Sequence, residues 1–84
     1  MQQTVLIQEK LAMFICILGD FSPRVAVDLQ AGALLREDIG FNWPDLRKLG
    51  KWIRHYWTIT IPPDDWADID TFGDLTAYLA ENGA

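Results

Sequence analysis

The segment Asn42–Trp57, NWPDLRKLGKWIRHYW, predicts a helix with two unlike faces. Asn42 suits the N-cap, Pro44 suits the first turn, where its missing N–H costs nothing, and Asp45 complements the positive end of the helix dipole. At about 100° per residue, an apolar stripe holds Leu46, Leu49, Ile53, Tyr56 and Trp57. The opposite arc is basic and holds Arg47, Lys48, Lys51, Arg54 and His55. We therefore expect a helix that buries the stripe and exposes the arc.

Two further long segments, one on each side of this helix, have helical periodicity. From Thr4 to Leu18 apolar residues recur at helical spacing, and Thr4 is the expected N-cap. Near the other end, Thr71 is expected to cap a last helix that ends before Gly83. The residues on the inner face of that helix are Phe72, Leu75 and Leu79. Each of these segments needs a partner against which to bury its apolar side.

The connections between the long helices differ in kind. Residues 21–40 have no clean long period, so we expect a long loop with a short helical turn near residues 31–35. Pro62 prevents the central helix from continuing, and Pro63 begins a short helix with Trp66 on its inner side. The predicted fold is therefore an all-α four-helix bundle with three main helices, one short helix and a long first loop, in a single domain spanning residues 1–84.

Composition limits the kinds of partner. Half of the 84 residues are hydrophobic, which is enough for a compact core. The net charge of −5 argues against nucleic acid, since binding to phosphate depends on positive charge. The apolar run from Leu11 to Leu18 is too short to span a bilayer. We therefore expect a cytoplasmic protein with neither nucleic acid nor a membrane as its partner.

The charges are unevenly distributed along the chain. Cations gather on the central helix, whereas no Lys or Arg follows Pro62. The acids in that last part are Asp64, Asp65, Asp68, Asp70, Asp74 and Glu81. They lack the alternating pattern of an EF-hand loop, and several suit helix N-termini. The sequence thus predicts an electrically two-sided molecule without a metal site.

Cysteine and histidine often act in catalysis or metal binding, but each occurs once in this chain and has a simpler interpretation. Cys16 is the only cysteine and lies in an apolar run, so we expect a buried hydrophobic side chain. His55 is the only histidine, and no second metal ligand stands at a useful spacing. Nothing in the sequence pairs a nucleophile with a base, and we expect no enzyme activity.

Three short motifs along the chain resemble those of the acyl carrier protein and peptidyl carrier protein family. Residues 38–44, DIGFNWP, are similar to the D-L-G-x-D-S-L motif that opens the family's second helix. Ile61-Pro62 resembles the I-P dipeptide that follows that helix, and Thr71–Leu75, TFGDL, resembles the opening of the last helix. The spacing between the three motifs matches that of the family, with no insertion or deletion needed. The resemblance implies a four-helix phosphopantetheine-binding fold.

The chain departs from this family where the family's chemistry resides. Trp43 occupies the position of the serine whose hydroxyl carries 4′-phosphopantetheine, and an indole cannot form that phosphodiester. Pro44 replaces the leucine that follows the serine. The resemblance also implies an acidic second helix, whereas this one is basic. We therefore expect no cofactor, and a surface that would repel the family's usual partner enzymes.

These observations favour a carrier-like protein that works by noncovalent protein binding. Trp43 would be the anchor, and Arg47, Lys48, Lys51 and Arg54 would attract an acidic patch on a protein partner. A second hypothesis is a small acidic inhibitor or immunity-type protein that uses the Asp-rich part. A third is an active carrier modified at Ser22, the only serine. Self-association through the tryptophans and the basic helix is also left open.

Overall fold

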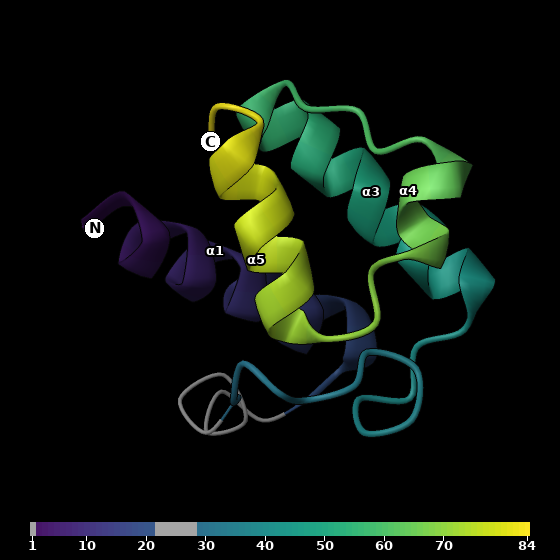
Figure 1. The fold of residues 1–84 in the computed structure, drawn as a ribbon. Coiled ribbons are helices and arrows are strands. Elements are labelled where there is room, and N and C mark those ends of the chain that lie inside the picture. Colours follow the sequence, from purple (N-terminus) through teal and green to yellow (C-terminus); the bar gives the residue numbers. More distant parts are fainter. Residues whose placement is uncertain (1, 22–28) are drawn as a thin grey trace.

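Four helices make up the regular structure of the described residues, in agreement with the predicted all-α fold. The computed structural model describes residues 2–21 and 29–84, with residues 2–4 described by their backbone alone. The helices are α1 (Gln2–Gly19), α3 (Trp43–Trp57), α4 (Pro63–Ala67) and α5 (Phe72–Glu81). The three long helices, the short α4 and the loop after α1 follow the predicted order (Figure 1).

The core lies where α1 meets α3 and α5. Both helices contact α1, and α5 crosses over α1 in the view of Figure 1. The fully buried side chains come from all three helices and from the loop, and include Leu11, Ile15, Leu35, Leu49, Ile53, Leu75 and Leu79. Cys16 is also buried, as expected. The predicted inner faces of α3 and α5 are therefore largely confirmed.

The start of α3 has the predicted cap. The side-chain oxygen of Asn42 accepts from the backbone N–H of Asp45 at 3.0 Å, and the Asp45 carboxylate accepts from the backbone N–H of Asn42 at 3.0 Å. This reciprocal pair satisfies two N–H groups at the helix start. It also fixes the direction in which Trp43, the first residue of α3, leaves the backbone.

The start of α5 is anchored to the long loop. The backbone N–H of Leu35 donates to the carbonyl of Asp70 at 2.9 Å, and the N–H of Phe72 donates to the carbonyl of Ala33 at 2.9 Å. No helix forms near residues 31–35, where a short helical turn was expected; the chain makes a single turn there, in which the N–H of Ala33 donates to the carbonyl of Gln30 at 3.0 Å. The loop's polar groups thus find partners both locally and at the start of α5.

Two further predictions were wrong in detail. The first helix begins at Gln2, so Thr4 lies within α1 and is not its N-cap. Tyr56, expected on the buried stripe of α3, is 55% exposed; it stands at the edge of that stripe, where its ring meets Phe14 edge to face. Ser22 lies outside the described residues.

Candidate functional site

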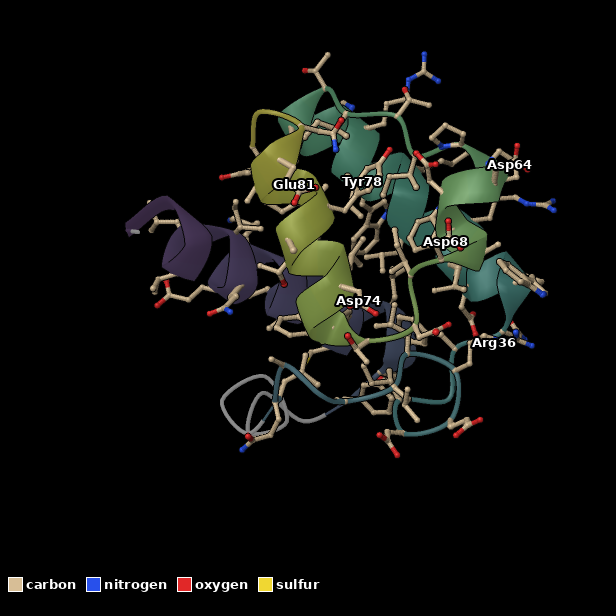
Figure 2. All side chains as sticks on the ribbon, viewed as in Figure 1. Arg36, Asp64, Asp68, Asp74, Tyr78 and Glu81 are labelled. Carbon is tan, nitrogen blue, oxygen red and sulfur yellow. The ribbon has the colours of Figure 1, made fainter. Side chains whose placement is uncertain are left out.

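Trp43 stands at the N-terminus of α3 with nearly half of its surface in solvent. Its side chain is 46% exposed, which makes it one of the few large exposed apolar residues outside α1. The guanidinium carbon of Arg36 lies 5.0 Å from the centre of the Trp43 rings. Figure 2 shows Arg36 projecting from the long loop on the side where α3 begins. The cation restrains the indole without covering it.

An apolar groove opens beside Trp43, between α3 and the segment that leads into α4. Its volume is about 290 Å³. The apolar part of its wall consists of Trp43, Leu46, Ile61, Pro63 and Trp66. Three cations stand around it, Arg47, Lys51 and Arg54, and none of the described residues that line it is a carboxylate. We call this feature the Trp43 groove; it combines an apolar interior with a positive rim.

Gly50 lines the groove beside Trp66. It lies in the middle of α3, where a Cβ atom would stand 3.5 Å from the Trp66 indole. That is ordinary van der Waals contact, so alanine would fit the backbone and would project into the groove. A glycine inside a helix costs about 1 kcal/mol relative to alanine. The open space above Trp66 thus depends on a residue that weakens the helix.

The structure unites most of the site residues predicted from the sequence. Trp43, Arg47, Lys51 and Arg54 all line the Trp43 groove. Lys48 is exposed on α3 but does not line it. The sequence did not identify Trp66 as part of the site, because its inward position on a short helix was explained by core packing alone. It also gave no signal for Arg36, which reaches Trp43 from the loop.

A second hollow lies on the other flank of α3, against α1. It is a shallow space of about 830 Å³ lined by Phe14, Trp52, Tyr56, Lys51, Arg54 and His55. Phe14 of α1 makes edge-to-face contacts with Trp52 and Tyr56, with ring centres 5.5 and 5.8 Å apart. We call this feature the Tyr56 hollow. Lys51 and Arg54 line both it and the Trp43 groove, so the two apolar surfaces share a positive ridge.

The acidic side of the molecule is formed by α4 and α5. Asp64, Asp74 and Glu81 project from these helices in Figure 2, as does Asp68 directly after the end of α4. The Tyr78 hydroxyl donates to the Asp65 carboxylate at 2.6 Å. This hydrogen bond, then burial, then the negative charge of Asp65 raise the pKa of Tyr78 above its ordinary value of 10.0. The two-sided charge distribution predicted from the sequence is thus present on separate helices.

One of these acids, Asp74, caps the start of α5, and Asp64 and Asp65 stand in the first turn of α4. The Asp74 carboxylate accepts from the backbone N–H of Thr71 at 3.2 Å, and the Thr71 hydroxyl oxygen accepts from the N–H of Asp74 at 2.9 Å.

Within residues 2–21 and 29–84, no three His, Cys, Asp or Glu side chains gather closely enough to hold a metal ion. In the same ranges, no helix has the length and apolar character needed to cross a membrane.

Comparison with models of known protein families gave no match, and neither did a search of curated proteins. The arrangement of side chains must therefore carry the functional argument. An apolar groove with a positive rim suits a ligand that combines an apolar group with negative charge.

Proposed function

We propose that this chain is a noncatalytic, carrier-protein-like module that binds a protein partner noncovalently through the Trp43 groove. It would act as a scaffold or regulator in a biosynthetic or modification pathway. The observation that carries the proposal is the Trp43 groove itself, with its exposed indole, apolar wall and three cations. Partly exposed tryptophans are common anchors at protein interfaces. The three cations of the groove would repel a partner with a basic surface.

The carrier-like part of the proposal rests on the resemblance of residues 38–44, Ile61-Pro62 and 71–75. A helix begins at the position where the family carries its serine, and it begins with Trp43. The indole occupies the place of the attachment point and has no hydroxyl to modify. The same helix end would thus hold a partner through burial of the indole instead of through a covalent arm.

The proposal can be tested by selection of peptides from a random displayed library on the immobilised protein. We expect the selected peptides to be rich in Asp and Glu and to carry an aromatic or aliphatic residue. Their binding should be lost with the double change Arg47→Glu and Lys51→Glu, and weakened in high salt. Lys51→Ala should weaken binding more than Lys48→Ala, since both are exposed lysines on α3 but only Lys51 lines the groove.

The second hypothesis, an acidic inhibitor, has its own supporting feature. A shallow hollow on α4 and α5 is lined by Asp65, Asp68, Asp74 and Glu81. An inhibitor that used this surface would select basic peptides, which would lose affinity with Asp68→Lys and keep it when Arg47 and Lys51 are reversed. That result would contradict binding through the Trp43 groove.

A further inference from the structure

Trp66, which forms part of the apolar wall of the Trp43 groove, belongs to a helix with little stability of its own. That helix, α4, has five residues and begins at Pro62 without a side-chain cap. An isolated helix of this length is unfavourable, since its first turn fixes several residues for one hydrogen bond. Contacts with the neighbouring helices therefore decide where α4 lies and where Trp66 stands.

The first of these contacts joins Trp66 to α3. The Trp66 side chain is buried, and its indole lies beside Gly50, where a Cβ atom would stand 3.5 Å from the ring. Both residues line the Trp43 groove. Apolar contacts of this kind are not directional. The contact thus holds α4 near α3 without fixing the exact position of the indole along it.

The second contact is a directional one and comes from α5. The Tyr78 hydroxyl donates to the Asp65 carboxylate at 2.6 Å, and Figure 2 shows Tyr78 on α5 beside α4. This bond spans thirteen positions of the chain. Hydrogen bonds to a charged acceptor are short, strong and sensitive to angle. Because Asp65 and Trp66 are consecutive residues, a bond that fixes Asp65 on α5 also limits where Trp66 can lie on α3.

We propose that Tyr78 is a positioning residue for the Trp43 groove, which acts through Asp65 and α4 to hold Trp66 where the groove can receive an acidic partner segment. This proposal rests on the proposed function, because it concerns the same binding site. Tyr78 does not line the groove itself. Its hydrogen bond holds α4 between α3 and α5, so the wall of the groove is in place before the partner arrives, and binding costs less ordering.

The surroundings of Asp65 show why a tyrosine suits this position. The shallow hollow beside it is also lined by Asp68, Asp74 and Glu81. Nearby carboxylates repel one another, so the conformation of Asp65 needs an attractive partner. The Tyr78 hydroxyl is a neutral donor with one hydrogen to give, and it therefore selects a single carboxylate. A lysine in the same place would be attracted to all of these acids at once.

The test uses the full chain, labelled with 5-fluorotryptophan, and a synthetic peptide that carries one phenylalanine followed by glutamates. Trp43→Phe and Trp66→Phe assign the two fluorine NMR signals that matter, and we expect the peptide to shift both. Tyr78→Phe should shift or broaden the Trp66 signal before peptide is added. It should also weaken binding about threefold or more, since losing one hydrogen bond changes an equilibrium by roughly two- to twelvefold and only the competent fraction binds.

Three further variants serve as comparisons. Asp65→Ala should reproduce both effects, and combining it with Tyr78→Phe should add little, because the two side chains form one contact. Asp65→Asn removes the same charge but keeps an oxygen that can accept from the hydroxyl, so it should retain more affinity than Asp65→Ala. Tyr56→Phe removes the hydroxyl of an exposed tyrosine on α3 and should change neither the Trp66 signal nor the affinity. A loss of overall stability alone would not move the Trp66 signal of the folded protein.

The outcomes separate the two proposals. If the peptide shifts the Trp43 signal, but Tyr78→Phe leaves the Trp66 signal and the affinity as in the wild type, the positioning role is wrong and the proposed function stands. Tighter binding to Tyr78→Phe would also overturn the positioning role, because the wall would then have to move aside for the peptide. If the peptide leaves the signals of Trp43 and Trp66 unchanged and binds equally well to Arg47→Glu, both proposals are wrong.

Discussion

The guanidinium group of Arg36 lies over the Trp43 rings, with 5.0 Å between the guanidinium carbon and the ring centre. This contact joins the long loop to the first residue of α3. Because Trp43 also forms one wall of the Trp43 groove, the loop contributes to the orientation of the proposed anchor although it does not line the groove itself.

We expect the pair of Arg36 and Trp43 to be energetically coupled. Cation–π contacts at exposed sites contribute about 0.5–1 kcal/mol. Urea unfolding of the wild type, Arg36→Ala, Trp43→Ala and the double variant should give a coupling free energy of that size. A double-mutant cycle with no coupling would mean that the contact with Arg36 does not stabilise the position of the Trp43 indole.

Gly50→Ala should stabilise the protein and narrow the groove beside Trp66. Removing a glycine from the middle of α3 should raise the free energy of unfolding by about 1 kcal/mol. The added methyl group would stand at contact distance from Trp66, so peptide binding at the Trp43 groove should weaken. Denaturant unfolding and a peptide titration on the same sample measure both effects. Binding that survives unchanged would place the ligand elsewhere.

The same chemical change at Gly73 should have the opposite effect on stability. A Cβ atom there would lie 2.9 Å from the carbonyl oxygen of Ala31, which is backbone and held by a hydrogen bond from the Gly73 N–H. We expect Gly73→Ala to lower the free energy of unfolding by roughly 1–3 kcal/mol. Equal effects at Gly50 and Gly73 would contradict the described docking of the loop on α5.

The hydrogen bond between Tyr78 and Asp65 should make stability fall at alkaline pH. The pKa of Tyr78 is raised in the folded state, so the contribution of this bond is complete below the unfolded pKa near 10. It is lost as pH rises through the unfolded value toward the folded one, because only the unfolded chain readily ionises there. Thermal unfolding between pH 8 and 11 should show a steeper decline for the wild type than for Tyr78→Phe. These pH limits span roughly the tyrosine titration range.

Tyr56→Phe provides the matched control for this experiment. Tyr56 is an exposed tyrosine on α3 with no hydrogen bond to a carboxylate among the described contacts. Its replacement should leave the alkaline slope as in the wild type. If both variants flatten the curve equally, general ionisation of tyrosines explains the decline.

Co-expression with a broad-specificity phosphopantetheinyl transferase should leave the intact mass of the protein unchanged. In the proposed carrier-like function, Trp43 stands where the modified serine would be and has no hydroxyl, and Pro44 and the basic arc would differ from the surface that such an enzyme meets. An increase that matches phosphopantetheine, and that disappears with Ser22→Ala, would identify a working carrier and would refute the loss of the attachment site.

Local sequence signals determined where α3 and α5 begin, although not where α1 begins. Asn42 with Asp45 and Thr71 with Asp74 each form a reciprocal cap from residues three positions apart, so short-range chemistry was sufficient to predict Asn42 and Thr71 as N-caps. The buried stripe of α3 followed from periodicity for Leu46, Leu49 and Ile53. It failed at Tyr56, which lies at the edge of the stripe and is exposed, because periodicity gives the direction of a side chain but not what packs against it.

The tertiary structure alone decided how the candidate site is assembled. Trp43 and Trp66 are 23 positions apart, and they line one groove only because the chain turns back after α3. Likewise, Phe14 reaches Tyr56 through the packing of α1 on α3. The sequence by itself determined which residues are apolar, charged or capping, since these are properties of single side chains and near neighbours. Which of them meet across a groove depends on long-range packing, which no local pattern encodes.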